Sequence, residues 1–245
     1  MKEYQAQTDS LAGKTILITG AGSGIGKALA IKCAALGASV ILLGKTVKKL
    51  EAVYDQIVAL GKQQAAILPV DLQGANEQHY RDLAATIKRE YGKLDGLVHN
   101  ASQLGVLGPF AQIDKSVWDE VIQTNLTAEF LLTKSLIPVL SLAEHASTLF
   151  TTSGVGNRGR AYWGAYSISK FATEGMMQVL ADEYEQSNLR FNAINPGATR
   201  TAMRTRAYPA EDAAKLKTAA EILPSYLYLL SDDSIDVTGQ RINAQ

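Results

Sequence analysis

The stretch Lys14-Thr15-Ile16-Leu17-Ile18-Thr19-Gly20-Ala21-Gly22-Ser23-Gly24-Ile25-Gly26 decides the fold of this chain. Residues 14–19 form an apolar run that ends in glycine, which predicts a buried strand. The apolar residues that follow have helical spacing, so we expect a helix near residues 24–36. A strand, a glycine-rich turn and a helix in this order bind phosphate. The glycines let the backbone approach a pyrophosphate, and the helix N-terminus presents free N–H groups.

A second motif lies in the C-terminal half of the chain. Tyr166 and Lys170 are four residues apart, a spacing that places both side chains on one face of a helix. The phenol of a tyrosine titrates near pKa ~10, so it is a poor base at neutral pH unless an adjacent cation favours the phenolate. Ser153 can hydrogen-bond the oxygen whose proton Tyr166 moves, as carbonyl reduction or alcohol oxidation requires. The alternative is a solvated pair on an amphipathic helix and a serine that caps a turn.

In combination, these motifs resemble those of the short-chain dehydrogenase/reductase family. The family signatures T-G-x-x-x-G-x-G and Y-x-x-x-K match residues 19–26 and 166–170. The resemblance extends from about residue 11 to about residue 243. It implies an oxidoreductase with a nicotinamide dinucleotide cofactor. The runs Trp163-Gly164-Ala165-Tyr166, Lys170–Met177 and Thr199–Met203 are typical of one bacterial subgroup of this family.

The resemblance also implies roles for individual residues. Ser153, Tyr166 and Lys170 would form the catalytic group together with Asn125, which would anchor a water that passes protons to solvent. Lys170 would also bond the nicotinamide ribose. Ser102 stands where the family has the glycine of an Asn-Ala-Gly run. The cofactor-binding residues that we expect are Gly20, Ser23, Gly24, Ile25, Gly26, Lys45, Asp71, Leu72, Asn100, Ala101, Tyr166, Lys170, Pro196, Gly197 and Thr199.

The end of the second expected strand indicates the choice of cofactor. Dinucleotide-binding folds read the adenosine ribose about 20 residues beyond the glycine turn, where an acidic residue selects a 2′-hydroxyl and a basic residue accommodates a 2′-phosphate. Here the strand ends in Gly44-Lys45-Thr46, without a carboxylate. Lys45 therefore favours NADP(H), although Ser23 occupies a position that is basic in some NADP-dependent relatives. Lys45 can alternatively be a solvated residue that opens the next helix.

Strands and helices alternate along the chain, which predicts an α/β fold, a Rossmann-like doubly wound parallel sheet of about seven strands in a single domain over residues 1–245. Ligands of such sheets bind at the carboxyl ends of the strands, so one cleft can gather the glycine turn, Asp71, Asn100, Ser153 and Pro196. We expect strands near 14–19, 38–43, 64–70, 94–99, 146–152, 189–194 and 240–243. We expect helices near 24–36, 46–60, 76–91, 115–140, 165–186 and 218–231.

Composition narrows the function further. The chain has 24 basic and 24 acidic side chains, so no overall positive field attracts nucleic acid. Its one cysteine, Cys33, cannot form an intrachain disulfide, and the three histidines share no metal-ligand spacing. Residues 1–12 lack the apolar core of a signal peptide, and no apolar run is long enough to span a membrane. We expect a cytoplasmic protein without a metal.

These observations favour an NADP(H)-dependent oxidoreductase that acts on a small-molecule carbonyl or alcohol. An NAD-dependent alcohol or sugar dehydrogenase and a non-catalytic dinucleotide sensor remain alternatives. The helix near 165–186 is apolar on more than one face, which favours a homodimer or homotetramer. The basic segment from Arg200 to Lys217 is expected to be a lid, and it either recognises an anionic substrate or an acyl carrier or is a solvated loop.

Overall fold

The computed structural model describes residues 1–61 and 65–245. Its described strands form one sheet of seven strands in the order β3-β2-β1-β4-β5-β6-β7, and every neighbouring pair is parallel. The predicted fold class is therefore confirmed. Residue 64, which we expected in the third strand, lies outside the described residues. The strands are β1 Thr15–Thr19, β2 Ser39–Gly44, β3 Ala65–Pro69, β4 Gly96–His99, β5 Ala146–Thr151, β6 Leu189–Asn195 and β7 Arg241–Asn243.

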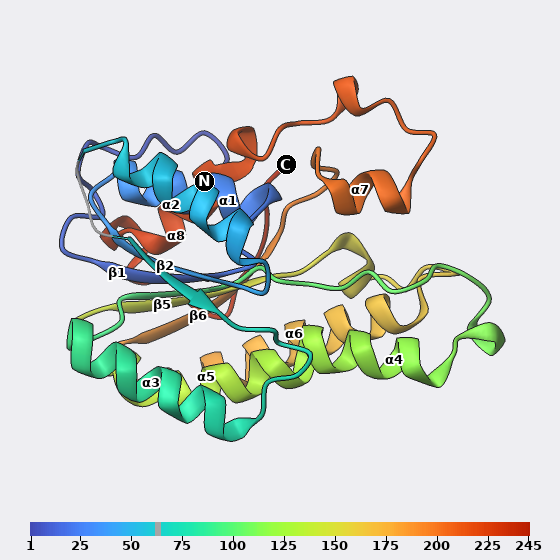
Figure 1. The fold of residues 1–245 in the computed structure, drawn as a ribbon, viewed down its shortest axis with the longest axis horizontal. Helices are drawn as coiled ribbons and strands as arrows, with labels where there is room; N and C mark the ends of the chain where they lie inside the picture. The colour runs from blue at the N-terminus through green and yellow to red at the C-terminus, as the bar shows by residue number, and fades with distance from the viewer. Residues whose placement is uncertain (62–64) are drawn as a thin grey trace.

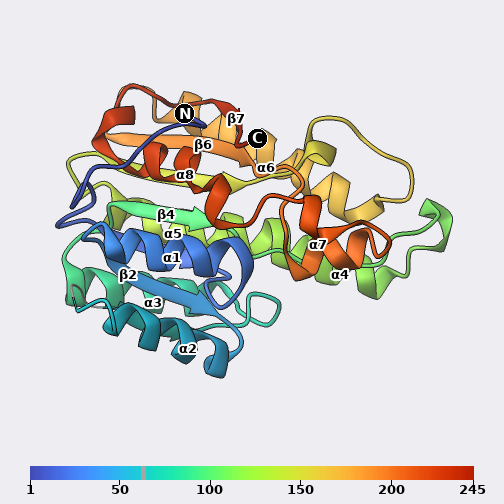
Figure 2. The ribbon, with the colours of Figure 1, turned by 90° about the horizontal axis from the view of Figure 1, so that it is seen from above.

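Helices cover both faces of the sheet, as Figures 1 and 2 show. One face carries α1 Gly24–Ala35, α2 Val47–Val58 and α8 Leu223–Leu230, and the other carries α3 Glu77–Tyr91, α5 Ala128–Leu140 and α6 Gly164–Glu183. Two further helices, α4 Lys115–Ile122 and α7 Ala202–Ala207, lie beyond the carboxyl ends of the strands. No described helix has the length and apolar character that crossing a membrane requires.

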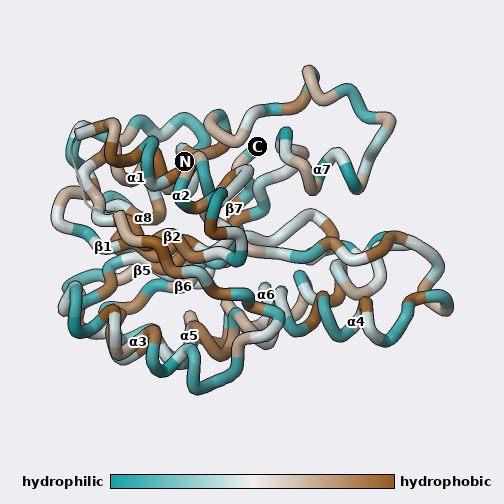
Figure 3. The backbone as a smooth tube through the Cα atoms, viewed as in Figure 1, coloured by the Kyte–Doolittle hydropathy of each residue, from teal (hydrophilic) through white to brown (hydrophobic). Residues whose placement is uncertain are grey.

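The core consists of two apolar layers, one on each side of the sheet. In β1, Ile16 and Ile18 belong to the layer under α1 and α8, whereas Leu17 belongs to the layer over α3 and α5. Successive side chains of a strand point to opposite faces, so a strand covered on both faces needs an unbroken apolar run. The sheet is accordingly the apolar centre of the molecule in Figure 3.

The predicted helix over residues 115–140 is helical but divided. A π-helical turn, Gln123–Thr127, separates α4 from α5. Within this turn the side chain of Asn125 accepts a hydrogen bond from the backbone N–H of Gln103 at 2.7 Å and donates one to its C=O at 2.9 Å. Wide turns of this kind occur in helices where a side chain makes a tertiary contact, and apolar spacing does not reveal them.

Two boundaries near the C-terminus also differ from the prediction. The expected helix over 218–231 is a 3-10 turn, Ala220–Ile222, followed by α8, which begins at Leu223. Pro224 has no N–H and fits only the first turn of a helix, so α8 cannot extend toward the N-terminus. The segment we expected to be an irregular lid contains α7, whose N-cap Thr201 accepts a hydrogen bond from the backbone N–H of Arg204 at 3.2 Å.

Candidate functional site

The glycine-rich turn after β1 requires glycine at two places for different reasons. Gly20 has φ +66°, which side chains other than glycine rarely allow. At Gly26 the constraint is space, because a Cβ there would lie 2.5 Å from the Gly20 carbonyl oxygen and 2.6 Å from Asn100 Nδ2. The start of α1 therefore packs directly on the end of β1. The role of Gly26 is to permit this packing.

The N-terminus of α1 leaves backbone N–H groups free to bind a ligand. The N-cap residue Ser23 makes no side-chain capping bond, and the first turn contains no acidic residue. The backbone N–H of Lys27 donates to the Ser23 carbonyl at 3.1 Å, so the N–H groups of residues 24–26 precede the helical hydrogen bonds. Free N–H groups and the positive end of the helix dipole attract an anion to this position.

Thr19 joins the glycine turn to the end of β4. Its hydroxyl accepts hydrogen bonds from the backbone N–H groups of Asn100 at 2.9 Å and Ala101 at 3.0 Å. The Asn100 side chain returns a bond from Nδ2 to the Thr19 carbonyl at 3.1 Å. Because β1 and β4 are adjacent where the strand order reverses, these bonds build the floor of a crevice at the switch point of the sheet.

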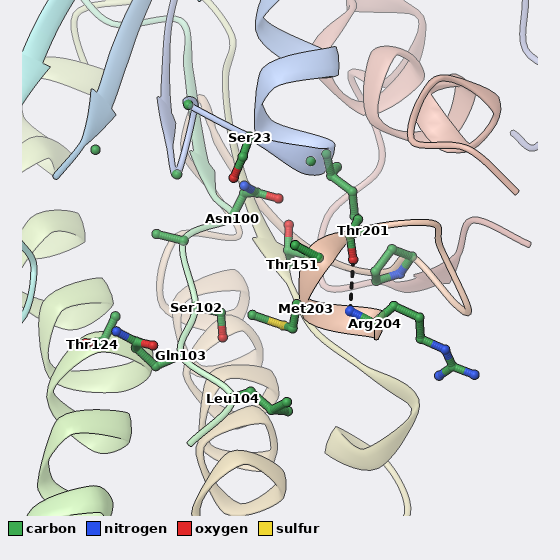
Figure 4. A pocket seen from close by; sticks show the side chains of 18 of the residues that line it. Ser23, Asn100, Ser102, Gln103, Leu104, Thr124, Thr151, Thr201, Met203 and Arg204 are labelled. Carbon is green, nitrogen blue, oxygen red and sulfur yellow. Dashed lines mark hydrogen bonds between the residues drawn. The ribbon is translucent and has the colours of Figure 1, made fainter. Parts of the chain in front are cut away.

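A cleft of about 550 Å³ lies at this edge of the sheet. Of the predicted residues, Gly26 and Asn125 do not line it, and all the others do. Figure 4 shows Ser23, Asn100 and Thr151 facing Thr201 of the α7 segment across the cleft. The predicted residues in the lining are Gly20, Ser23, Gly24, Ile25, Lys45, Asp71, Leu72, Asn100, Ala101, Ser153, Tyr166, Lys170, Pro196, Gly197 and Thr199.

Tyr166 and Lys170 lie on α6, and Ser153 is the N-cap of the 3-10 turn that follows β5. Lys170 is 2% exposed, and its ammonium donates to the Thr151 carbonyl at 2.9 Å. Tyr166 is 8% exposed. The 3-10 turn after β5 passes close to α6, since a Cβ on Gly156 would lie 2.9 Å from Lys170 Cβ. Tyr166 and Lys170 thus lie one helical turn apart on α6, and both line the cleft.

A hydrogen-bond network that includes β7 holds the backbone carbonyl of Ser153. Arg241 on β7 donates from Nη2 to the Ser153 carbonyl at 3.2 Å and from Nε to Glu174 at 2.8 Å. The same oxygen of Glu174 accepts a hydrogen bond from Thr152 Oγ1 at 2.7 Å. The sequence did not indicate Arg241 and Glu174, because contacts between β7 and α6 depend on how the sheet and its helices pack.

Asn125 lies behind the cleft rather than in it. Its side chain is fully buried, and Nδ2 donates to Ser169 Oγ at 3.0 Å in addition to its two bonds with Gln103. The role that we expect for Asn125, to anchor a water, stays a prediction, and the structure places the residue behind the cleft wall. It braces the Gln103 segment, which does line the cleft, and it joins this segment to α6.

The adenosine end of the expected dinucleotide site carries more positive charge than the sequence indicated. Lys45, Thr46 and Lys49 all line the cleft, and Lys49 approaches the glycine turn closely enough that a Cβ on Gly22 would lie 3.0 Å from Lys49 Cβ. Asp71 is the single carboxylate among the lining residues. The sequence did not indicate Lys49, which lies in the first turn of α2, whereas Lys45 precedes the N-cap residue Thr46.

The basic segment around α7 is largely engaged with its own surroundings. Arg204 forms two bonds of 2.6 Å with Glu211, and its guanidinium lies 3.8 Å from the centre of the Tyr208 ring. This pairing lowers the pKa of Glu211 from its usual range. Arg200 donates to the carbonyls of residues 213, 214 and 216. Figure 4 shows the Arg204 guanidinium pointing away from the other labelled side chains, and both Arg204 and Arg206 belong to the lining of the cleft.

Two buried titratable groups lie near Lys170. Burial, followed by the charge of Lys170, lowers the pKa of His99 to about 3, so its ring is neutral and shares a 2.8 Å hydrogen bond with Thr133. Burial raises the pKa of Glu129 to about 7, against the opposing effects of Lys170 and Thr173. In the part of the chain that the structure describes, no group of three His, Cys, Asp or Glu side chains can hold a metal ion.

The geometry fits a dinucleotide. The tight packing of Gly20 and Gly26 opens the backbone at the end of β1 to a pyrophosphate. Farther along, the hydroxyls of Ser102 and Thr124 are buried without a hydrogen-bond partner among the residues that the structure describes, and both residues line the cleft. Buried hydroxyls are usually satisfied, so these two are suited to bind polar atoms of a ligand.

Comparison with known proteins agrees with this geometry. The family model described as short chain dehydrogenase matches residues 14–212. The oxidoreductase YciK of Escherichia coli strain K12 is 48% identical over 242 residues, which are 99% of this chain and 96% of YciK. This relative confirms the predicted bacterial subgroup.

Solved structures show the same similarity. A short chain dehydrogenase from Pseudomonas syringae superimposes with a TM-score of 0.98 and 49% identity, over 99% of each chain. A short chain dehydrogenase from Escherichia coli CFT073, solved in complex with NADPH, superimposes with a TM-score of 0.95 and 49% identity, over 98% of this chain and 99% of the other. The family match and the near-complete coverage lead to one conclusion: the chain belongs to the short-chain dehydrogenase/reductase family of oxidoreductases.

Proposed function

We propose that the chain is an NADP(H)-dependent oxidoreductase that transfers a hydride between the nicotinamide and the carbonyl or alcohol carbon of a small molecule. The observation that carries this proposal is the shared cleft. Ser153, Tyr166 and Lys170 line the same cavity as the glycine turn, so acid/base chemistry and dinucleotide binding meet in one place. A sensor that only binds a dinucleotide has no need for this group of three residues.

The nicotinamide, when bound, donates or accepts the hydride, and the protein's own residues handle the proton. Tyr166 acts as the general acid in reduction and as the general base in oxidation. Ser153 hydrogen-bonds the substrate oxygen, and the Lys170 ammonium stabilises the phenolate. By its family relationship, Lys170 also bonds the nicotinamide ribose. Asn125 supports this arrangement from behind through Gln103 and Ser169.

The preference for NADP(H) rests on the charges at the end of β2. Lys45 and Lys49 line the cleft beside Thr46, and no carboxylate occupies the position that would select a 2′-hydroxyl. A similar protein was solved with NADPH, which supports the same choice. The runner-up, an NAD-dependent alcohol or sugar dehydrogenase, would need an acidic residue where Lys45 stands.

The substrate end of the cleft favours a compound with an apolar part. Leu104, Trp163, Met203 and Ala207 line it, together with the polar Gln103. Figure 4 shows the Met203 side chain reaching from α7 toward Ser102. Apolar side chains with a few convergent polar groups are typical of small-molecule sites. We therefore propose an aldehyde, ketone or secondary alcohol with an apolar body as the substrate.

The test is Tyr166→Phe, assayed with NADPH and a panel of aldehydes, ketones and β-keto esters. The ring and its packing remain while the transferable proton is lost, so we expect turnover to fall roughly 10²- to 10⁴-fold with nearly unchanged NADPH binding. Tyr162→Phe is the matched control, since Tyr162 is 63% exposed four residues before Tyr166. More than about half of the activity remaining in Tyr166→Phe would show that Tyr166 is not the acid/base.

A further inference from the structure

A buried carboxyl lies directly behind the proposed catalytic lysine. Glu129 on α5 and Lys170 on α6 are each 2% exposed, and Glu129 Oε1 lies 3.7 Å from Lys170 Nζ. Glutamate is almost never fully buried unless it is paired. An acidic group in this position can act on any residue that depends on the charge of Lys170.

The two oxygens of Glu129 have different environments. Oε2 accepts a 2.9 Å hydrogen bond from Thr173 Oγ1. Oε1 is buried and has no hydrogen-bond partner among the described residues, since its 3.7 Å separation from Lys170 is too long for one. Lys170 is held independently by the Thr151 carbonyl at 2.9 Å. The ammonium therefore keeps its place whether Glu129 is charged or neutral, and the carboxyl acts on it mainly through charge.

The other titratable groups around Glu129 are neutral or engaged elsewhere. His99 on β4 is neutral because its pKa is about 3. On α6, the carboxylate of Glu174 accepts hydrogen bonds from Thr152 and Arg241. From the α3 side, Glu77 pairs with Arg81 and Lys134 at the surface. Among the described residues, Lys170 is the charged partner that faces Glu129. Burial raises the pKa of Glu129 to about 7, so its charge changes near neutral pH.

We propose that Glu129 is a positioning residue that acts through Lys170: its carboxylate offsets the ammonium charge felt at Tyr166, and so favours carbonyl reduction over alcohol oxidation. A general acid must carry its proton to act, whereas a general base must have lost it. A negative charge beside the cation weakens the stabilisation of the phenolate. The inference rests on the proposed function, because it takes Tyr166 as the acid/base.

The first test follows the ionisation of Tyr166 without cofactor or substrate. Phenolate absorbance is titrated in the wild-type chain and in Glu129→Gln, each with and without Tyr166→Phe, so that the difference within each pair isolates Tyr166. Glutamine keeps the size of the side chain and an acceptor for Thr173 while it removes the charge. We expect the Tyr166 phenolate to form about 0.5–1 pH unit lower in Glu129→Gln. An unchanged or higher midpoint would overturn the inference.

Two controls separate charge from packing. Glu120→Gln neutralises an exposed carboxylate on the neighbouring helix α4, and solvent screening should leave the phenolate midpoint unchanged. Thr173→Val removes the hydrogen bond to Glu129 but keeps the carboxyl, which is ionised in the alkaline range where tyrosine titrates. It should also leave the midpoint unchanged. A shift in either control as large as that in Glu129→Gln would contradict an effect specific to this charge.

Turnover provides a second measurement. With NADPH and 4-nitrobenzaldehyde as the probe carbonyl, kcat for reduction should decline at a lower pH in Glu129→Gln, by the same shift as the phenolate. KM should change little. A shift of the phenolate without a shift of the rate profile would support the effect of Glu129 on Tyr166 and contradict Tyr166 as the acid. The failure of the proposed function is thereby distinguished from failure of the inference.

Unfolding reports the titration of Glu129 itself. Because its pKa is raised from 4.5 to about 7 in the folded chain, the folded state binds more protons than the unfolded state between these values. Stability from this group is thus present below about pH 4.5 and is lost as pH rises to about 7. The denaturant midpoint of unfolding of Glu129→Gln should rise relative to that of the wild type across this pH window, and the difference should then stay constant. A difference that still grows well above pH 7 would show that Glu129 is neutral in the alkaline range, which would overturn the inference.

Discussion

At the scale of single residues, we propose that two lysines select the dinucleotide that the cleft accepts. Lys45 and Lys49 both line the adenosine end, where the sequence alone had indicated only Lys45. We propose that both ammonium groups bind the 2′-phosphate and that each contributes part of the discrimination against NADH. Charge-assisted hydrogen bonds contribute about 1.5–3 kcal/mol each, which corresponds to roughly 10- to 100-fold in affinity.

We therefore predict that Lys49→Ala weakens NADPH binding by roughly 10-fold and leaves NADH binding nearly unchanged, and that Lys45→Asp reverses the preference. Fluorescence titrations at fixed salt measure both affinities. Lys48→Ala is the matched control, because Lys48 is exposed on the same helix and does not line the cleft. If the unmodified protein bound NADH as tightly as NADPH, the NAD-dependent alternative would replace the proposal.

At the scale of elements, the junction of β1 and α1 depends on how closely the helix approaches the strand end. Gly26 is the point of closest packing, with the Gly20 carbonyl and the Asn100 side chain both within 2.6 Å of where a Cβ would stand. Backbone atoms cannot yield as the end of a flexible side chain can. Any side chain at residue 26 must therefore push α1 away from the turn that it completes.

Gly26→Ala is thus predicted to lower the free energy of unfolding by about 1–3 kcal/mol and to weaken dinucleotide binding, because the free N–H groups move with the helix. Chemical denaturation and NADPH titration measure the two effects. Gly175→Ala in α6 is the control: a Cβ there meets nothing within 4 Å, and alanine favours a helix interior by roughly 0.5–1 kcal/mol. Equal stability changes in the two variants would argue against close packing as the cause.

At the scale of the whole molecule, α6 and α5 leave apolar side chains uncovered on one face. Phe171 and Val179 on α6 are 44% and 63% exposed, and Phe130 on α5 is 49% exposed. Both helices cover the same face of the sheet in Figure 1. Exposed apolar side chains gathered on one surface are typical of subunit interfaces. Family relationship also favours a two-fold contact between these helices, so we propose a homodimer or homotetramer.

Light scattering at micromolar concentration is expected to give at least twice the mass of one chain. The double variant Phe171→Asp, Val179→Glu should shift the protein toward the monomer, since burying unpaired charges in an apolar contact is costly. Val58→Asp is the control, because Val58 is 51% exposed on α2, on the opposite face of the sheet. A monomer mass for the unmodified protein would contradict the proposal.

The sequence by itself determined the fold class, the succession of strands and helices along the chain and the place of the glycine turn. These features depend on local patterns: an apolar run long enough for a strand covered on both faces, glycines where the backbone turns, and helical spacing beyond. It also placed Tyr166 and Lys170 on one helix, because a spacing of four residues has a fixed geometry.

Only the tertiary structure decided what surrounds these residues. Glu129 is 41 residues from Lys170 in the chain, and the Arg241 side chain reaches Ser153 across 88 residues, so no local pattern could pair them. The same holds for Asn125, which the sequence placed in the site and the folded chain places behind it. Contacts between elements depend on how the sheet and its helices bring distant segments together. Burial between those elements, not residue type, raises the pKa of Glu129 to about 7.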